Sequence, residues 1–361
     1  MLKIPEDQVG ILGGGFHELG KPILVCVYDS GVNYRDEIAR QYALYIYDEG
    51  HHVGAKTFKE IAWSCLTPYR MVLSATIERD DANEEMIYKM TGDKVYEITF
   101  YELVKAGYLA PVRVEFIEVE FPEDERKKYE KLDEELTKVR EEIRKLYTRY
   151  SLEAMEEGYT SIGDYLRKTK NPEYTELNRR ATSLRSRMRV LEQANSNKVL
   201  RALELTEKHL AEGNRIFVFT NLEKQANKIY SKLRAKYGEK VGLVIGKTST
   251  EERDRLFKLF KEGKIQCIVT TTVLDEGIDA PTSDVAIVVS SRAIRHPRQF
   301  VQRIGRVVRP LPGKVAKIYI LRTVGVNGAE ERTLEGLKEE LDRVYEFTKM
   351  EKLIENMERE K

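Results

Sequence analysis

Three stretches of sequence decide the fold: RIFVFTN at residues 215–221, IQCIVTTT at residues 265–272 and VAIVVSS at residues 285–291. Each is an apolar run that ends in small polar residues. Uninterrupted apolar runs of this length are typical of strands buried on both faces in a parallel sheet. Amphipathic helical patterns at residues 221–237 and 250–263 separate the runs. Strands alternating with helices predict an α/β fold that binds ligands at the carboxyl ends of its strands.

The first hundred residues repeat this alternation. Strand patterns occur as PILVCVYDS at residues 22–30, YALYIYDE at residues 42–49, YRMVLSAT at residues 69–76 and KVYEITF at residues 94–100. Residues 56–66 have an amphipathic helical pattern. The sequence therefore predicts a further parallel α/β sheet in this half of the chain.

The segment between the two α/β patterns is long, charged and helical. Its apolar and aromatic residues recur in steps of three and four, the spacing of a seam between packed helices. They are Tyr129, Leu132, Leu136, Val139, Ile143 and Leu146. We therefore expect an antiparallel helical arm inserted between two α/β domains. The predicted divisions are residues 1–121 for the first α/β domain, 122–195 for the arm, 196–325 for the second α/β domain and 326–361 for a helical tail.

Composition restricts the class of protein. Charged residues make up 34% of the 361 residues, yet the net charge is +1, which indicates a dense mixture of both signs. Such a surface still binds nucleic acid wherever a local stripe is positive. The apolar runs fall short of the roughly 18 residues that a membrane span needs. Cys26, Cys65 and Cys267 lie far apart, so we expect reduced, buried thiols in a cytoplasmic protein and neither zinc nor a disulfide.

An acidic pair, Asp48 and Glu49, directly follows the strand pattern YALYIY. Two carboxylates at the mouth of a buried strand suit a magnesium–nucleotide site, one holding Mg²⁺ through water and the other polarising the attacking water. Alone the pair is weak support, because loops are rich in acids. Three further motifs give it context: SAT at residues 74–76, TTTVLDEGIDAP at residues 270–281 and QRIGRVVR at residues 302–309.

In this order and on these elements, the four motifs resemble motifs II, III, V and VI of superfamily 2 helicases. DEGHH at residues 48–52 resembles the DE-x-HH of the archaeal XPB type. SATIERDD resembles that family's third motif, which runs into an Arg-Glu-Asp triplet; the matching residues are Arg79, Asp80 and Asp81, with Asp80 in place of Glu. The helical arm is where the family carries its thumb. The resemblance implies two RecA-like parallel-sheet domains with a thumb-like insertion.

The resemblance also implies ATP and Mg²⁺ as cofactors, bound between the two domains. Asp48 would hold Mg²⁺, Glu49 would activate water, and His51 would link the site to the second domain. Arg306 and Arg309 would act as arginine fingers. The remaining nucleotide-site matches are Gln302, Arg303, Gly277 and Asp279, and the matches that would couple hydrolysis to movement are Ser74, Ala75, Thr76, Arg79, Asp80 and Asp81.

DNA is the partner that the resemblance implies, as a single strand or a fork. Small polar residues at the other strand ends would contact sugar and phosphate without reading bases. They are Ser30, Thr220, Asn221, Thr248, Ser249 and Thr270. A basic run on the arm, Arg179 to Arg189, either adds a DNA contact or is an ordinary solvated helix face. The resemblance also allows a nuclease partner.

A P-loop is the expected feature that the sequence does not supply. GLVIGKT at residues 242–248 has only three residues between its glycines, and Val241 stands where the G-x-x-x-x-G-K-[ST] pattern needs glycine. In the family the P-loop precedes every motif found here, so we expect the first domain to be incomplete. Whether the chain is a fragment, a truncated gene product or half of a split enzyme stays open, and so does a non-catalytic DNA- or protein-binding role.

One residue of the acidic motif departs from the family pattern. Gly50 stands where these helicases have Cys, Ala or Val. Glycine carries no side chain to restrain the backbone. We therefore expect Gly50 to loosen the turn after the acids.

Overall fold

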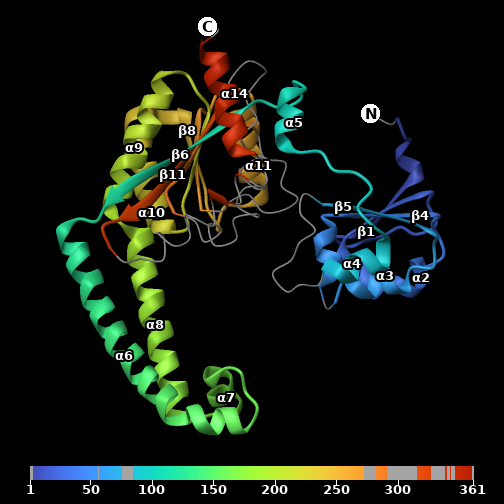
Figure 1. Cartoon of the computed structure of the whole chain (residues 1–361). Helices are drawn as coiled ribbons and strands as arrows, with labels where there is room; N and C mark the ends of the chain where they lie inside the picture. Colours follow the sequence, from blue (N-terminus) through green and yellow to red (C-terminus); the bar gives the residue numbers. More distant parts are fainter. Residues whose placement is uncertain are drawn as a thin grey trace. The chain divides into compact units, whose positions relative to one another are not determined.

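The computed structural model describes residues 3–55, 57–74, 84–271, 282–290, 315–326, 338–339, 342 and 346–359. The chain divides into two compact units, Met1–Ile98 and Thr99–Lys361. Each contains parallel strands connected through helices (Figure 1). The predicted α/β class with two parallel-sheet parts and a helical insertion is confirmed.

The first unit contains two small sheets. The strands β1 (Val9–Gly13), β2 (Phe16–His17) and β3 (Ile23–Cys26) form one sheet in the order β2-β1-β3, and β4 (Leu44–Asp48) pairs with β5 (Tyr69–Leu73) in the other. The pairs β1–β3 and β4–β5 are parallel. The helices are η1 (Glu6–Gln8), α1 (Tyr28–Asn33), α2 (Arg35–Ile38), η2 (Gly50–Gly54), α3 (Lys59–Ser64) and α4 (Glu84–Thr91).

The second unit is built on one parallel sheet of six strands, in the order β6-β11-β10-β7-β9-β8. These are β6 (Val112–Glu120), β7 (Ile216–Phe219), β8 (Val241–Val244), β9 (Cys267–Thr270), β10 (Val285–Val288) and β11 (Ala316–Val324). Every residue of β7, β9 and β10 is buried. Alternate residues of β7 enter different core clusters, Phe217 in one and Ile216 in the other. Both faces of the sheet are therefore covered, as the apolar runs predict.

Helices supply the two covering layers of this sheet. They are α5 (Phe100–Lys105), α9 (Ser196–Ala211), α10 (Glu223–Tyr237), η3 (Gly238–Lys240), α11 (Thr250–Lys261) and α14 (Phe347–Arg359). The longest described segment of the predicted tail is α14, which packs back onto the unit: Arg113 of β6 donates two hydrogen bonds to Glu358, each 3.0 Å long. No helix in the described part of the chain is long and apolar enough to cross a membrane.

Two predictions near the domain boundary are wrong. Residues 112–120 were expected in the first domain, but β6 pairs with β11 in register from Val112↔Ala316 to Glu120↔Val324, so the boundary lies at residues 98/99 and not at 121. Residues 94–100 form no strand. Thr99 instead caps α5 in a capping box with Glu102, a local signal that outweighs the apolar alternation.

The arm is confirmed as a helical hairpin, and it emerges from within the second unit, between β6 and α9. Its helices are α6 (Glu123–Glu156), α7 (Ile162–Lys168) and α8 (Pro172–Ala194), and α6 packs along α8 (Figure 1). The seam residues pack in one cluster with Tyr174, Leu177 and Leu184 of α8. Because both ends of the arm join the same sheet unit, the arm is an extension of that unit.

Asn195 lies between α8 and α9, where the arm rejoins the sheet unit, and it fixes this junction. It is fully buried. Its side-chain amide lies 3.4 Å from Val119 O, 3.3 Å from Glu120 O and 3.2 Å from Thr323 Oγ1. Its Oδ1 accepts the Asn197 backbone N–H at 3.0 Å, which caps α9. One side chain thus connects α9 to β6 and β11.

We predict that Asn195→Ala destabilises the second unit by about 2–3 kcal/mol, because it removes a helix cap and the buried amide that bonds Val119 O and Thr323 Oγ1. Urea unfolding followed by far-UV circular dichroism measures this. The control is Asn197→Ala, which removes a half-buried donor to Glu120 O and should cost less than about 1 kcal/mol. Equal effects of the two substitutions would contradict the assigned role of Asn195.

Candidate functional site

The carboxyl ends of β3, β4 and β5 converge in the first unit. Asp48 ends β4 and pairs in register with Leu73 of β5, one residue before Ser74. Tyr28, two residues after β3, donates its hydroxyl to Asp48 O at 2.8 Å. His51 Nδ1 lies 3.2 Å from Ser74 Oγ, so the segments of the predicted motifs II and III are in contact. The structure therefore groups Asp48, Glu49, His51 and Ser74.

Glu49 has an uncommon backbone conformation. Its φ of 47° and ψ of 47° lie in the left-handed region, which costs a non-glycine residue about 1–3 kcal/mol where the surrounding structure enforces it. Its backbone N–H donates to Asp48 Oδ1 at 3.0 Å, and its Oε2 lies 3.7 Å from His51 Nδ1. The tight turn thus holds both carboxylates and the imidazole within a few residues of one strand end.

Gly50 does not loosen this turn, contrary to expectation. It is buried, and a Cβ added to it would lie 2.3 Å from Val72 Cγ1 on β5. Valine is branched at Cβ and has few alternative rotamers, so it cannot easily move aside. The missing side chain is what lets the acidic turn pack directly against β5.

Aromatic side chains pack around the turn that follows β4. The ring centroids of Tyr28 and Phe58 are 5.2 Å apart, and those of His51 and His52 are 4.1 Å apart. Burial, and next the charges of Asp48 and Glu49, raise the pKa of Tyr28, so its hydroxyl remains a donor. Tyr28 and Phe58 were not singled out from sequence as site residues, although an aromatic residue at the carboxyl end of a strand pattern was an available signal for Tyr28.

The acidic pair offers the carboxylate oxygens that Mg²⁺ takes as ligands. Among the residues that the structure describes, no three His, Cys, Asp or Glu side chains gather as a metal site. Magnesium needs only one or two carboxylates, because it keeps water and takes phosphate oxygens. Asp48, exposed at the strand end, can supply such a ligand.

Strand ends also line up in the second unit, where five of the predicted DNA contacts lie. Val244 pairs with Thr270, Phe219 pairs with Thr270, and Val288 pairs with Phe219, so Thr220, Asn221, Thr248, Ser249 and Thr270 share one edge of the sheet. Ser249 is exposed and caps α11 by accepting the Glu252 N–H at 3.2 Å. Asn221 and Thr248 are half-buried.

Thr220 and Thr270 are not available for DNA in this structure, which corrects the sequence prediction. They are 2% and 1% exposed. The Thr220 hydroxyl donates to Gln225 Oε1 and lies 2.9 Å from Ser290 Oγ, which in turn accepts the Asn221 N–H at 3.0 Å. Gln225 and Ser290 were missed. A polar residue at an apolar position of the helical pattern was the signal for Gln225.

The GLVIGKT segment has the wrong geometry for a P-loop. Val241, where the pattern needs glycine, is buried in β8. The following loop closes on itself, since Ile245 N–H donates to Thr248 Oγ1 and Thr248 N–H donates to Ile245 O, both at 2.9 Å. Lys247 lies 3.3 Å from Glu223. The amides of Ile245 and Thr248 are therefore already engaged within the loop.

Several predicted residues lie outside the part of the chain that the structure describes. They are Ala75, Thr76, Arg79, Asp80, Asp81, Gly277, Asp279, Gln302, Arg303, Arg306 and Arg309. Ser30 is described: it is half-buried in α1 of the first unit.

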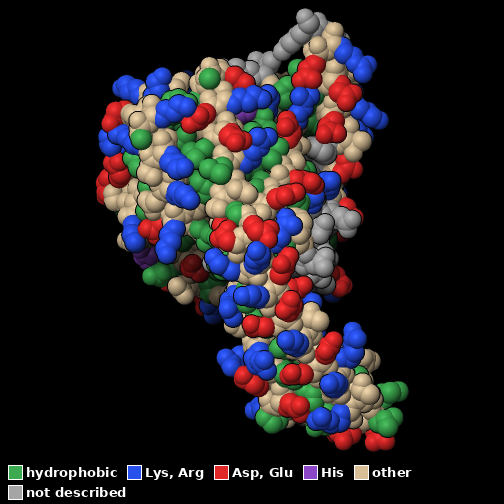
Figure 2. Space-filling view, turned by 90° about the vertical axis from the view of Figure 1, so that its left-hand side faces the viewer, with side chains coloured by type: hydrophobic (Ala, Val, Ile, Leu, Met, Phe, Trp, Pro, Cys, Tyr) green, Lys and Arg blue, Asp and Glu red, His purple; other side chains and the backbone are tan. Residues whose placement is uncertain are grey.

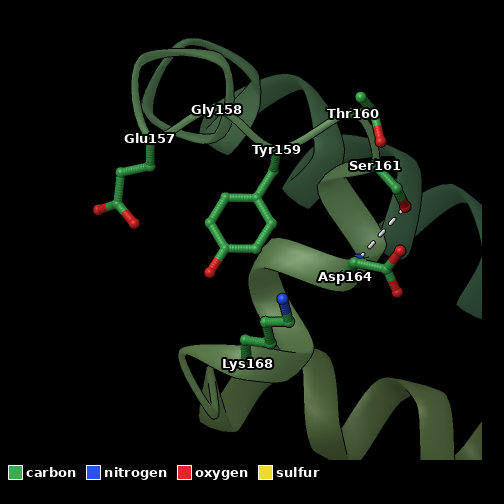
Figure 3. A pocket seen from close by; sticks show the side chains of 7 residues that line it. All are labelled: Glu157, Gly158, Tyr159, Thr160, Ser161, Asp164 and Lys168. Carbon is green, nitrogen blue, oxygen red and sulfur yellow. Dashed lines mark hydrogen bonds between the residues drawn. The ribbon is translucent and has the colours of Figure 1, made fainter.

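The arm carries a mixed surface and a shallow pocket. Arg179 forms two hydrogen bonds with Glu176, and Arg180 lies 3.9 Å from Glu142. Figure 2 shows basic and acidic side chains interspersed along the arm and over the adjoining face of the second unit. At the arm tip, Lys168 Nζ lies 5.1 Å from the centre of the Tyr159 ring in a pocket of about 410 Å³ (Figure 3). Arg179 and Arg180 of the basic run are therefore paired with acidic side chains of the arm.

We predict that Gly50→Ala destabilises the first unit by about 1–3 kcal/mol, because the new methyl group overlaps Val72. The single tryptophan, Trp63, lies in α3 of this unit, so its fluorescence during urea unfolding reports the change. The double substitution Gly50→Ala with Val72→Ala should recover most of the loss. Gly246→Ala, where nothing lies within 4 Å of the added Cβ, is the control. A loss that Val72→Ala does not relieve would disprove the steric explanation.

Comparisons with known proteins show which helicases this chain resembles. The helicase conserved C-terminal domain matches residues 195–310. The DNA 3'-5' translocase XPB2 of Sulfurisphaera tokodaii is 29% identical over 307 residues, which are 85% of this chain and 64% of that protein. The DNA 3'-5' helicase XPB of Kineococcus radiotolerans is 25% identical over 315 residues, 85% of this chain and 45% of that protein. The chain thus spans about half to two-thirds of these relatives' length.

A solved structure agrees in fold. The Pyrococcus furiosus Hef helicase domain has a TM-score of 0.55 and 18% identity, covering 94% of this chain and 84% of that domain. At this identity the likeness shows the fold alone. In sequence the chain is similar to XPB-type DNA helicases of superfamily 2, and its second unit carries the helicase conserved C-terminal domain.

Proposed function

We propose that this chain is the hydrolytic and second-domain part of an ATP-dependent DNA helicase or translocase that acts in DNA repair or transcription in the cytoplasm. The observation that carries the proposal is the grouping of Asp48, Glu49, His51 and Ser74 at one strand edge. These side chains come from separate segments, yet they meet where an α/β sheet binds its ligand.

Each residue of this edge has a distinct task in the proposal. Bound Mg²⁺ would neutralise charge on the phosphates of ATP. Asp48 would hold the ion through water, and Glu49, fixed by its left-handed backbone, would orient and polarise the attacking water. His51 contacts both Glu49 and Ser74, so a change at the acids reaches the segment after β5 through a single side chain.

The remaining roles rest on the motif matches. Arg306 and Arg309 would act as arginine fingers, since a planar guanidinium makes bidentate contacts with phosphate. Gln302, Arg303, Gly277 and Asp279 would complete the nucleotide site. Ala75, Thr76, Arg79, Asp80 and Asp81 would couple hydrolysis to movement.

Fewer residues are proposed as DNA contacts than the sequence suggests. Ser249, Thr248 and Asn221 keep accessible surface at the carboxyl edge of the second sheet, and Ser30 does so in the first unit. Contacts of this kind hold the backbone of DNA and give no sequence preference. A nuclease partner, allowed by the resemblance, is a further part of the proposal that a pull-down assay can test.

A second candidate is a non-catalytic module that binds DNA or a partner protein. One observation favours it: the G-x-x-x-x-G-K-[ST] pattern of a P-loop occurs nowhere in the 361 residues. The similar string GLVIGKT forms a loop closed by a hydrogen bond between Ile245 and Thr248. The two candidates differ in whether a P-loop supplied by further polypeptide restores turnover.

We predict that the 361-residue chain alone hydrolyses ATP no faster than background, with or without DNA, because nothing in it cradles the phosphates. Phosphate release measures this, with Glu49→Gln as the matched variant. Equal background rates for both chains are expected. DNA-stimulated turnover that Glu49→Gln abolishes would show that the chain holds ATP by itself.

We predict that the chain binds fork DNA weakly, without sequence preference, and that moderate salt nearly abolishes binding because phosphate contacts dominate. Ser249→Asp keeps the cap of α11 but adds a negative charge at the proposed edge, so affinity should fall about tenfold. The control is Asn171→Asp, which makes the same kind of change at the cap of α8 on the arm. Fluorescence anisotropy at several salt concentrations measures both. Equal losses in the two variants would remove Ser249 from the interface.

A further inference from the structure

Two separate elements hold the last turn of α8, where the arm rejoins the sheet unit. The final carbonyl groups of a helix have no acceptor role inside the helix, so other groups must bond them when they are buried. Thr323 of β11 donates to Glu192 O at 2.9 Å. Gln225 of α10 donates its side-chain amide to Gln193 O at 3.1 Å. The bond from Gln225 thus connects the arm to α10.

The oxygen of the same amide group contacts two strand ends. Gln225 Oε1 accepts a hydrogen bond from the hydroxyl of Thr220, directly after β7, and lies 3.1 Å from Ser290 Oγ, two residues after β10. Gln225 is 5% exposed, so water does not compete for these bonds. One buried side chain therefore joins the arm to the carboxyl ends of β7 and β10.

The chemistry of the contacts determines which way round this amide group lies. Gln193 O is a carbonyl oxygen and can only accept, so the amide nitrogen must face it. The amide oxygen then faces the hydroxyls of Thr220 and Ser290, which can donate to it. The glutamine amide therefore fits this position in one orientation only.

A polar residue at this place in α10 is itself informative. The other buried residues of the helix are Ala226, Ile229 and Leu233, which are the ordinary choice for a face that packs on a sheet. Burying an amide group costs free energy unless its hydrogen bonds are made. Gln225 makes them only when α8, β7 and β10 lie as they do here, so it specifies that arrangement.

Asn221 at the carboxyl edge depends on the same group of residues. Its backbone N–H donates to Ser290 Oγ at 3.0 Å, and the next N–H, of Leu222, lies 3.3 Å from Thr220 Oγ1. Within the part of the chain that the structure describes, Asn221 Nδ2 is buried without a hydrogen-bond partner. The backbone bond to Ser290 is therefore a main constraint on where Asn221 lies.

We propose that Gln225 is a positioning residue, which fixes Asn221 at the carboxyl edge of the second sheet relative to the base of the arm. A displacement of the last turn of α8 then reaches Asn221 through Gln225 and Ser290. The inference rests on the proposed function, in which Asn221 contacts DNA. Gln225 is buried, so it acts on DNA through Asn221 and does not touch it.

Gln225→Glu tests the connection because it separates the two ends of the amide group. The carboxylate keeps an acceptor for Thr220 and Ser290, but it sets a second acceptor against Gln193 O, so at about pH 7.5 the bond to the arm is lost. Hydrogen exchange measured by mass spectrometry should then be about tenfold faster in residues 188–195 and 219–222, because one buried hydrogen bond is missing. Exchange in β9 should stay unchanged.

Acid provides a rescue that a packing defect cannot imitate. Burial raises the pKa of a carboxyl group, so the introduced side chain is protonated at about pH 5. Its hydroxyl then donates to Gln193 O, as the amide does. At this pH the variant and the unaltered chain should exchange at the same rate in both segments.

The matched control is Asn227→Asp, which makes the same change from amide to carboxylate on an exposed side chain of the same helix. It should leave exchange in both segments unchanged. In anisotropy titrations with fork DNA at about pH 7.5, Gln225→Glu should bind about three- to tenfold more weakly than Asn227→Asp. The two variants carry the same added charge, so charge alone does not explain such a difference.

Ser290→Ala is a second variant, which keeps the bond between Gln225 and the arm. It removes the acceptor of the Asn221 N–H, so exchange should be faster in residues 219–222 and unchanged in residues 188–195. If Gln225→Glu does not fold, the neutral Gln225→Met replaces it in the exchange experiment, with faster exchange expected in both segments.

Four outcomes would overturn the proposal. Faster exchange throughout the second unit with a lower Tm would make Gln225 a core residue only, and unchanged exchange in residues 219–222 would separate Asn221 from the arm. Failure of acid to restore the Gln225→Glu variant would assign its effect to packing. Equal DNA affinity of Gln225→Glu and Asn227→Asp would show that the connection does not position a DNA contact.

The exchange experiment requires no DNA, so the two proposals can fail separately. If the unaltered chain binds no fork DNA, the proposed function is rejected together with the role of Asn221. The predicted exchange pattern would then still establish that Gln225 connects the arm to the strand ends.

Discussion

The parallel direction of the strands is the constraint on which the rest of this structure depends. Because parallel strands place their carboxyl ends on one edge, residues far apart in sequence meet there without any special loop. In the first unit this brings Asp48, His51 and Ser74 together, and in the second it aligns Thr220, Asn221 and Thr270. Parallel strands also need cover on both faces. The second unit satisfies that need, and the first satisfies it on one face only.

In the second unit, the connection from β6 to β7 supplies both the arm and the covering helix α9. The arm leaves the sheet after β6 and returns through α9, so its two helices are fixed at one base. Asn195 and Thr323 link that base to β6 and β11 through buried hydrogen bonds, and Thr323 also donates to Glu192 O at 2.9 Å. Buried polar groups of this kind favour one arrangement of the elements, since any other leaves them without partners. The arm is therefore expected to move with the second unit.

The acidic turn combines a strained residue with one that has no room for a side chain. Glu49 adopts a left-handed conformation that glycine would adopt more readily, yet glycine there would remove the carboxylate. The next residue is glycine for a different reason, because Val72 leaves no room for a side chain. Strained positions persist where the surrounding structure enforces them. Here β5 and the aromatic group around Tyr28 supply that support.

The sequence by itself determined the features that depend on local pattern: the buried strands β7, β9 and β10, the seam of the arm, and the acidic pair after a strand. Each is a periodicity or a short motif, and such signals depend on near neighbours in the chain. Tertiary structure alone decided that β6 joins the second sheet, because the choice of sheet depends on β11, about 200 residues away. It also decided that Thr220 and Thr270 are buried, that Gly50 packs against Val72, and that Ile46 and Met71 of the first unit are exposed. Each of these depends on a partner distant in sequence, and alternation of apolar residues shows which side of a strand seeks burial without showing what covers it.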